Sequence, residues 1–234
     1  MIRVGVAGAA GRMGETVCAA VEGAPDMELC GRADPRLDCT LDQMLEQASP
    51  EVVVDFTRPD TACENALKCL RSGVHVVIGT TCFDLQGLTE QAEAIAATQG
   101  EEPANLLAAP NFAIGAVLMM RFASEAAKHM AKAEIVELHH DGKLDAPSGT
   151  AARTAQLMAQ AAGGAPPPIH SVRLTGLVAN QEVILGDVGQ TLTIRHDTTG
   201  RESFMPGVLL AIRGVRALEG RPVVGLEHIL FEGK

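Results

Sequence analysis

The residues best suited to chemistry lie between Glu137 and Ala151, in the segment ELHHDGKLDAPSGTA. His139 and His140 can donate or accept protons near neutral pH, and Lys143 adds a positive charge. The segment then reaches Ser148, whose hydroxyl can cap the start of a helix. This combination favours a pocket for a small dicarboxylate or phosphate, with acid–base groups within reach.

The flanking patterns predict how this segment is held. Residues 133–138 alternate apolar and polar types, as a half-buried strand does, and residues 149–162 are rich in good helix formers. The segment is therefore a loop from a strand end to a helix start, with the amides of Gly149 and Thr150 pointing at a bound anion. Each feature has an ordinary explanation, because neighbouring strand residues face opposite sides and a loop lysine is usually solvated. Their combination within about a dozen residues favours a functional site.

The composition is that of a soluble globular protein with one large or two small domains. The chain has 234 residues, of which 47% are hydrophobic and 21% charged. Its net charge of −10 and its lack of Trp and Tyr argue against a nucleic-acid binder, which needs a basic face or stacking platforms. We find no signal-peptide pattern and no apolar run long enough to span a membrane, so we expect a cytoplasmic protein.

The cysteines do not form a recognisable framework. None belongs to a CxxC pair, and neither a disulfide scaffold nor a metal site is indicated. We expect reduced thiols and no bound metal. The six cysteines are Cys18, Cys30, Cys39, Cys63, Cys69 and Cys82.

A glycine-rich turn follows the first predicted strand, residues 2–7, and precedes a helical run, residues 15–21. Strand, glycine turn and helix are the context of a dinucleotide-binding fingerprint, in which backbone amides approach a pyrophosphate at the helix start. The turn reads Gly8-Ala9-Ala10-Gly11-Arg12-Met13-Gly14. Arg12 could add a phosphate contact or be a solvated surface residue.

Asp34 follows the second predicted strand, residues 27–33, and lies 20 residues after Gly14. An acidic residue at this place binds the ribose 2′-hydroxyl of a dinucleotide. The alternative, a turn residue before Pro35, does not account for the spacing. Arg36 could pair with a 2′-phosphate, so the residues leave NADH and NADPH both open.

Strands continue to alternate with helices up to residue 113, which predicts a parallel α/β sheet. Further strands are expected at residues 51–56, 74–78 and 105–109, with helices at 41–48, 60–71 and 85–97. Ligands bind beyond the carboxyl ends of such strands. We therefore place a nicotinamide cofactor along the five turns at residues 8–14, 34, 56–57, 79–81 and 109–112.

The second half of the chain predicts a different arrangement. A helix at residues 114–130 leads out of the first domain. Strands at 169–174, 182–185 and 190–195 would form a mixed sheet packed on the helix at 149–162. A final helix is expected at 203–218, before residues 223–231 close the chain.

On these residues the sequence resembles the 4-hydroxy-tetrahydrodipicolinate reductase (dihydrodipicolinate reductase) family. The resemblance implies an α/β fold: an N-terminal Rossmann-type parallel sheet completed by the C-terminal segment, residues 1–113 and 201–234. It also implies an inserted α+β domain on a mixed sheet, residues 114–200, which binds substrate and builds a homotetramer. The shared motifs span nearly the whole chain: GAAGRMG (8–14), DFTRP (55–59), GTT (79–81), PNFAIG (110–115), HHDGKLDAPSGTA (139–151) and RESF (201–204).

The resemblance implies hydride transfer from NADH or NADPH to 4-hydroxy-tetrahydrodipicolinate in diaminopimelate and lysine biosynthesis, giving tetrahydrodipicolinate and water. His139 would be a proton donor and acceptor and Lys143 a proton donor, and which of them delivers the proton stays open. Substrate contacts would be His140, Gly149 and Thr150. The cofactor would contact Gly8, Ala9, Ala10, Gly11, Arg12, Met13, Asp34, Gly79, Thr80, Thr81, Ala109, Pro110, Asn111 and Phe112.

Three positions depart from the family pattern. Cys82 replaces the usual glycine after GTT, and Gln181 stands where a GxH motif has its histidine. Pro35 follows Asp34 where NADPH-using relatives often carry a basic residue, which favours dual or NADH-leaning use. The alternatives are another Rossmann oxidoreductase acting on an amino-acid-like substrate, for which we find no catalytic signature, and a non-catalytic cofactor-binding regulator.

Overall fold

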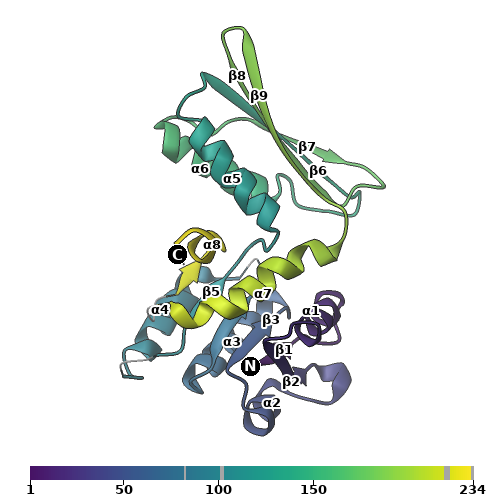
Figure 1. Ribbon diagram of the computed structural model, residues 1–234, viewed down its shortest axis with the longest axis vertical. Coiled ribbons are helices and arrows are strands. Elements are labelled where there is room, and N and C mark those ends of the chain that lie inside the picture. Colours follow the sequence, from purple (N-terminus) through teal and green to yellow (C-terminus); the bar gives the residue numbers. More distant parts are fainter. Residues whose placement is uncertain (82, 101–102, 219–221, 233–234) are drawn as a thin grey trace. The chain divides into compact units, whose positions relative to one another are not determined.

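The computed structural model describes residues 1–81, 83–100, 103–218 and 222–232 (Figure 1). Cys82, one of the departures from the family pattern, lies outside the described residues. The chain divides into two compact units. We call Met1–Phe112 with Phe204–Lys234 the terminal unit, and Ala113–Ser203 the inserted unit.

The terminal unit is built on a six-stranded sheet in the order β10-β5-β4-β3-β1-β2, with every neighbouring pair parallel. The order reverses direction between β1 and β3, and such a switch point is where doubly wound sheets bind ligands. The expected parallel sheet, completed by the C-terminal segment through β10, is confirmed. The strands are β1 (Ile2–Ala7), β2 (Met27–Ala33), β3 (Val52–Asp55), β4 (His75–Ile78), β5 (Leu106–Ala108) and β10 (Val223–Val224).

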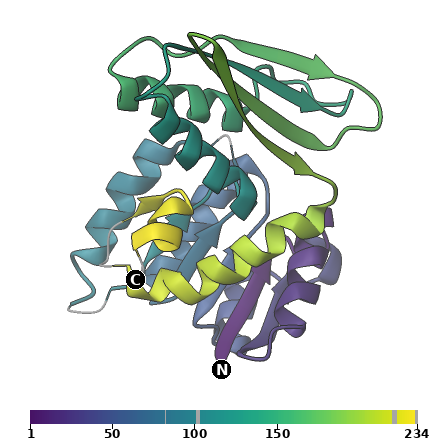
Figure 2. The same cartoon turned by 45° about the horizontal axis from the view of Figure 1, so that its top comes forward.

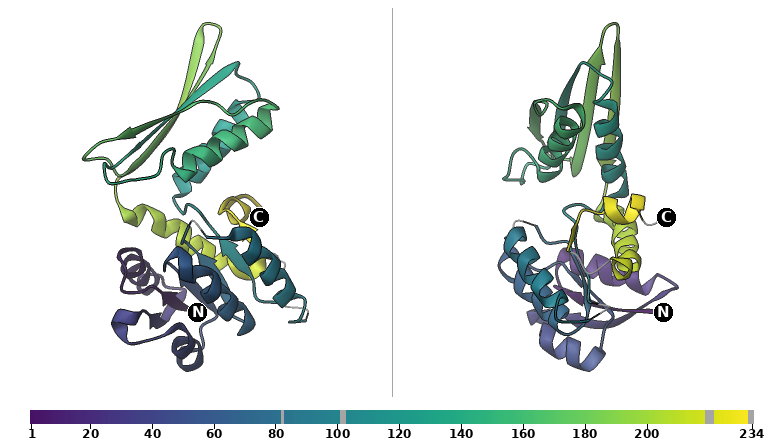
Figure 3. Two further views of the ribbon diagram at one scale, coloured as in Figure 1. Left: turned by 180° about the vertical axis from the view of Figure 1, so that it is seen from behind. Right: turned by 90° about the vertical axis from the view of Figure 1, so that its left-hand side faces the viewer.

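Helices cover both faces of this sheet, which is why its central strands are apolar throughout. Val52, Val53 and Val54 of β3 are all fully buried. Helices α2 (Leu41–Ala48), α3 (Pro59–Arg71) and α4 (Leu85–Ala96) share one core with the strands. Figure 3 shows α7 (Met205–Gly214), which packs on α1 (Arg12–Glu22), on the opposite face from α3 and α4. A short helix, α8 (Glu227–Glu232), follows β10.

The inserted unit has a four-stranded mixed sheet in the order β7-β6-β8-β9, in which only β6 and β7 run parallel. Helices α5 (Ile114–Ala126) and α6 (Gly149–Ala162) cover one face (Figure 2). Met119 and Met158 of these helices pack on Ile135, Val183 and Leu185 of the sheet. The strands are β6 (Lys132–His139), β7 (Ile169–Arg173), β8 (Ala179–Asp187) and β9 (Gln190–Thr198). The expected mixed sheet under a helix is confirmed.

Several boundaries differ from those expected. Helix α5 ends at Ala126 and not at residue 130, because Lys128 and His129 donate to carbonyls three residues back and tighten the chain into turns. The final helix is split into a 3₁₀ turn at Arg201–Phe204, then α7, then a second 3₁₀ turn at Val215–Ala217. Proline in the first turn of α7 marks its start.

Candidate active site

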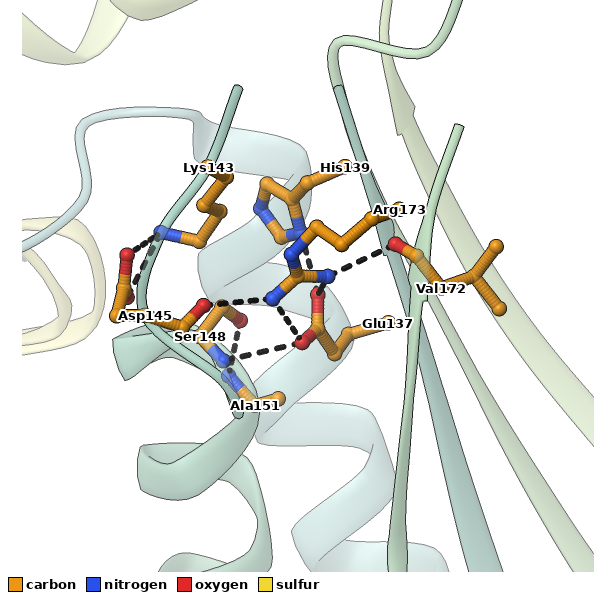
Figure 4. A network of polar contacts seen from close by, with 8 residues as sticks. All are labelled: Glu137, His139, Lys143, Asp145, Ser148, Ala151, Val172 and Arg173. Carbon is orange, nitrogen blue, oxygen red and sulfur yellow. Dashed lines mark hydrogen bonds and ion pairs between the residues drawn. The ribbon is translucent and has the colours of Figure 1, made fainter. Parts of the chain in front are cut away.

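A buried carboxylate, Glu137, lies at the centre of the polar cluster in the inserted unit (Figure 4). Strand alternation on β6 turns Ile135, Glu137 and His139 toward the helix-covered face. Arg173, at the end of the neighbouring strand β7, donates from Nη1 to Glu137 Oε2 at 2.9 Å and from Nη2 to Oε1 at 2.8 Å. Such a bidentate pair has both strength and fixed geometry.

The Glu137 carboxylate has three further partners: the Ser148 amide, the His139 ring and the Ser171 side chain. Its Oε1 accepts the Ser148 amide at 3.2 Å, and its Oε2 lies 2.5 Å from His139 Nδ1. Burial alone would raise the pKa of Glu137, but hydrogen bonds from Arg173, Ser171 and His139 outweigh it and lower the pKa to about 2. Glu137 is therefore a carboxylate at neutral pH.

His139 is held as a neutral ring. Its side chain is 14% exposed, and burial is the main cause that lowers its pKa below the ordinary 6.5, with Lys143 and Arg173 acting in the same direction against Glu137. A neutral imidazole has one protonated nitrogen. Nδ1 is the ring nitrogen that lies against the Glu137 carboxylate, and Nε2 is the other.

Lys143 lies in the loop after β6, with its Nζ bound to both oxygens of Asp145 at 2.7 and 2.8 Å. The ammonium group keeps the pKa of Asp145 below its usual value. Arg173 Nη2 donates to the Asp145 carbonyl at 2.7 Å, just before a cis peptide bond between Ala146 and Pro147. The same guanidinium therefore holds Glu137 and the loop that carries Lys143.

Ser148 caps α6 as expected, because its hydroxyl accepts the Ala151 amide at 3.2 Å. A Cβ added to Gly149 would meet nothing within 4 Å, so the first turn of the helix is open on that side. An open helix N-terminus binds anions through its amides and dipole. Thr150 follows in this same turn, while His140 is an exposed residue after the strand.

Gln181, a departure from the family pattern expected from the sequence, is buried on β8 opposite Glu137. Its Nε2 donates to Thr154 Oγ1 of α6 at 2.8 Å. Its Oε1 is buried with no hydrogen-bond partner among the described residues. The glutamine therefore links the sheet to α6 directly behind the cluster.

In the terminal unit, neighbouring strands end at residues that pair with one another. Ala7 pairs with Ala33 and Asp55, and Ile78 pairs with Asp55 and Ala108. The turns after these strands therefore begin side by side along one edge, as the alternating pattern predicted. They hold Gly8, Ala9, Ala10, Gly11, Asp34, Gly79, Thr80, Thr81, Ala109, Pro110, Asn111 and Phe112, while Arg12 and Met13, also expected to bind cofactor, begin α1.

The glycine turn fits a dinucleotide because its backbone packs so closely on neighbouring backbone that there is no room for a Cβ. Gly8 has φ of +77°, and a Cβ there would lie 2.7 Å from the Phe56 carbonyl oxygen. A Cβ on Gly14 would lie 2.0 Å from the Gly8 oxygen. Gly11, the N-cap of α1, has no side chain to cap the helix amides. Those amides are left for a phosphate, as the fingerprint requires.

Asp34 stands at the end of β2 against this turn. Its Oδ2 accepts the Ala10 amide at 3.1 Å and its Oδ1 accepts the Arg36 amide at 2.9 Å. The exposed Arg36 side chain donates to the Ala10 carbonyl at 3.2 Å. A carboxylate and a guanidinium therefore both lie beside the glycine turn.

A second buried carboxylate, Asp55, connects the turns after β3 and β4. Its Oδ1 accepts the Thr57 amide at 3.0 Å, the Thr57 hydroxyl at 2.7 Å and the Thr80 hydroxyl at 3.2 Å, and its Oδ2 accepts Asn65 Nδ2 at 2.9 Å. This network fixes Thr80, one of the predicted cofactor residues.

The aromatic ring of Phe56 connects the same turns with the one after β5. A Cβ on Gly79 would lie 2.2 Å from this ring, and the ring centroids of Phe56 and Phe112 are 5.8 Å apart. Gly79 is therefore needed for close packing, and the Phe112 ring packs on Phe56 at a tilt of 50°.

Sequence reasoning missed the carboxylates and the guanidinium that hold both sites. The sequence identifies Glu137 only as the first residue of the candidate segment and as part of a strand, although its place two residues before His139 puts both on one face. Arg173 and Asp145 were not singled out, and no local pattern pairs residues 36 positions apart, as Glu137 and Arg173 are. Asp55 was noted only as part of a motif.

Fold and site together define a class of protein. A parallel doubly wound sheet with a glycine turn at its switch point, joined to a unit with a lysine–histidine acid–base cluster, is the framework of a reductase that uses a nicotinamide cofactor. No cluster of metal-ligating side chains and no helix long and apolar enough to cross a membrane is found among the residues that the structure describes.

Comparison with known proteins gives the family. The family model described as dihydrodipicolinate reductase, N-terminus, matches residues 2–112, and the model for its C-terminus matches residues 115–230. The chain belongs to the dihydrodipicolinate reductase family, whose curated members are named 4-hydroxy-tetrahydrodipicolinate reductase.

Individual relatives match over their full length. The 4-hydroxy-tetrahydrodipicolinate reductase of Mycolicibacterium smegmatis is 48% identical, covering 98% of this chain and 99% of the relative. That of Thermobifida fusca is 46% identical over the same shares. Among solved structures, dipicolinate-bound dihydrodipicolinate reductase from Paenisporosarcina sp. TG-14 is 38% identical with a TM-score of 0.84, covering 98% of this chain and 99% of the other.

Proposed function

We propose that this chain reduces 4-hydroxy-tetrahydrodipicolinate with NADH or NADPH, giving tetrahydrodipicolinate and water in diaminopimelate and lysine biosynthesis. The observation that carries the proposal is the cluster in which His139, Lys143 and the start of α6 are held around Glu137. Full-length similarity to curated reductases supports the same activity.

The first task of the residues is to bind a dianion. Lys143 already holds a carboxylate, that of Asp145, through both oxygens. A substrate carboxylate can take the place of Asp145 on this ammonium group. The second carboxylate is assigned to the amides of Gly149 and Thr150 at the open end of α6, with His140 as a further contact. Two anchored carboxylates fix the orientation of the ring.

The second task is proton transfer. When bound, the reduced nicotinamide supplies a hydride, and one proton must enter as water leaves. Lys143 has three N–H donors and is assigned as the proton donor. His139 is assigned as a proton donor and acceptor beside it. Binding of a dianion favours the ammonium form of Lys143 until the proton is transferred.

Asp34 and Arg36 support use of both cofactors. The Asp34 carboxylate is assigned to the adenosine ribose hydroxyls, and the exposed Arg36 guanidinium to a 2′-phosphate. Fluorescence titration of NADH and NADPH checks this. Arg36→Ala is expected to weaken NADPH binding about tenfold and to leave NADH binding nearly unchanged. Asp34→Ala is expected to weaken NADH binding more than NADPH binding. Equal losses for both cofactors in both variants would contradict dual use.

The proposal includes a homotetramer and a cytoplasmic location. The sheet of the inserted unit is covered by α5 and α6 on one face, and its other face is assigned to subunit contact. Light scattering on the purified chain checks the mass of the assembly. A monomer at micromolar concentration would contradict the tetramer and leave the assigned chemistry untouched.

The activity is tested by oxidation of NADH or NADPH, followed at about 340 nm, where reduced nicotinamide absorbs. A synthase generates the substrate in place from pyruvate and aspartate semialdehyde. We expect rapid oxidation, inhibition by dipicolinate, and a loss of about 10²–10⁴-fold in kcat for Lys143→Ala. Lys128→Ala removes an exposed lysine paired with Glu125 and serves as the control. Cofactor binding without oxidation would overturn the proposal in favour of a regulator.

A further inference from the structure

We infer that Glu137, clamped by Arg173, is a positioning residue that holds His139 in the Nδ1–H tautomer and so makes Nε2 a proton acceptor in the substrate loop. The inference rests on the proposed function for its catalytic consequence. Its structural part, the tautomer of His139, can be tested without measuring catalysis.

The donors around Glu137 leave one position for the proton between Glu137 and His139. Oε1 receives the Ser148 amide and Arg173 Nη2, while Oε2 receives Arg173 Nη1 and faces His139 Nδ1. The Ser171 hydroxyl also donates to the carboxylate. A backbone amide and a guanidinium are donors only. They keep both oxygens of the buried group in the role of acceptors, so the proton between Oε2 and Nδ1 belongs to the imidazole.

The catalytic consequence concerns Nε2, the other ring nitrogen of His139. Nδ1 is occupied, and Figure 4 shows Nε2 on the side of the ring toward Lys143. The charged groups acting on the ring are Glu137, Lys143 and Arg173, and the ring is neutral because its pKa is lowered. In this state Nε2 cannot donate. It can accept a hydrogen bond or a proton, which complements the donor role assigned to Lys143.

An exposed glutamate–histidine pair between β6 and β7 provides a contrast. Glu134 lies 2.6 Å from His170 Nε2, but the side chains are 53% and 59% exposed. Among the described residues no arginine is paired with Glu134, and solvent reaches both side chains. The Glu137–His139 pair differs because each oxygen of its fully buried carboxylate has a second, fixed donor.

Glu137→Gln tests the inference because it replaces one oxygen by a donor of equal size. The Ser148 amide cannot turn away, so the carboxamide oxygen is expected at the Oε1 position. The NH₂ group then faces His139 Nδ1 and Arg173 Nη1. It can only donate, so Arg173 Nη1 loses its acceptor and must turn away, while Nδ1 remains beside the NH₂ group. Nδ1 must become an acceptor, and the ring must change to the Nε2–H tautomer.

The direct measurement is long-range ¹H–¹⁵N NMR of the full chain with labelled histidine. The chain has seven histidines, and His139→Asn assigns the signals of His139. Near neutral pH we expect Nδ1–H with Nε2 unprotonated in the wild type, and the reverse in Glu137→Gln. An Nε2–H tautomer in the wild type would overturn the inference. This result needs no variant, so a misfolded Glu137→Gln leaves the test intact.

Kinetics test the positioning role. Glu137→Gln is expected to lower kcat about 100-fold, within the usual range of acid–base contributions, while KM changes only a few-fold because the anion-binding groups remain. Glu125→Gln is the matched control: Glu125 is an exposed glutamate of α5, 3.9 Å from His129, and its loss should change neither quantity. A variant with the reversed tautomer and unchanged kcat would overturn the catalytic part. An inactive wild type with the expected tautomer would instead point to failure of the proposed function.

Discussion

Arg173 and Glu137 form a two-point ion pair, with Nη1–Oε2 at 2.9 Å and Nη2–Oε1 at 2.8 Å. The same guanidinium donates to the carbonyl oxygens of Val172 and Asp145, at 2.8 and 2.7 Å. One side chain thereby connects the ends of β6 and β7 with the loop that leads into α6. The loop that carries Lys143 is held in this way because a buried charge on the sheet requires a partner.

Arg173→Ala should strongly destabilise the chain. It leaves the Glu137 carboxylate buried without its counter-charge, and breaking such a pair typically costs about 3–5 kcal/mol. Urea unfolding followed by circular dichroism measures the loss. Arg213 makes the same two-point contact with Asp26 at 2.7 and 2.8 Å, but on the surface. Arg213→Ala should lose about 1 kcal/mol or less, and equal losses for the two variants would refute the argument.

Stability should fall in acid because of Glu137. Its pKa is about 2 in the folded chain against an ordinary 4.5, so the unfolded chain binds the proton more readily. The resulting stabilisation, about 3 kcal/mol, is present above pH 4.5 and is lost as the pH falls toward about 2. Unfolding free energies measured across this range should decline less steeply in Glu137→Gln. Parallel curves for variant and wild type would be inconsistent with a charged, paired Glu137.

Gly14→Ala should abolish cofactor binding. An added Cβ would lie 2.0 Å from the Gly8 oxygen. The backbone of the turn must therefore move, and its amides no longer point at the pyrophosphate. Gly23, at the other end of α1, provides the comparison, because a Cβ there would meet its nearest atom at 3.4 Å. Isothermal titration with NADH should detect no binding for Gly14→Ala at concentrations that saturate Gly23→Ala. Retained affinity in Gly14→Ala would mean that the turn does not hold the pyrophosphate.

Asp55→Ala should weaken cofactor binding, although Asp55 is not among the cofactor residues that the sequence predicted. The substitution removes the acceptor of Thr57 and Thr80 and leaves half-buried donors without it, at up to about 1–3 kcal/mol for each. We expect NADH affinity to fall at least about tenfold, together with a lower Tm. Asp60→Ala, which removes an exposed aspartate paired with Arg58, should change neither. An unaltered affinity in Asp55→Ala would show that Thr80 is dispensable for the cofactor.

The sequence by itself determined the order of strands and helices. Burial on both faces favours apolar strands such as β3 with its run of three valines, and helix starts and glycine turns depend on local sequence. The boundaries of β1, β2, α2 and α6 agree with the predicted ranges. The candidate residues His139, Lys143 and Ser148 were also visible, because they lie within one short segment whose ends are a strand and a capped helix.

The tertiary structure decided what holds those residues and in which chemical state. Glu137 meets Arg173 only because β7 pairs with β6 after a helix and a long loop, and Asp55 meets Thr80 only because β4 pairs with β3. Such contacts depend on strand register over tens of residues, which no local pattern encodes. The protonation of His139 follows from burial and from the neighbours that the fold brings to it. The sequence therefore determined which groups are present, and packing determined which of them carry protons.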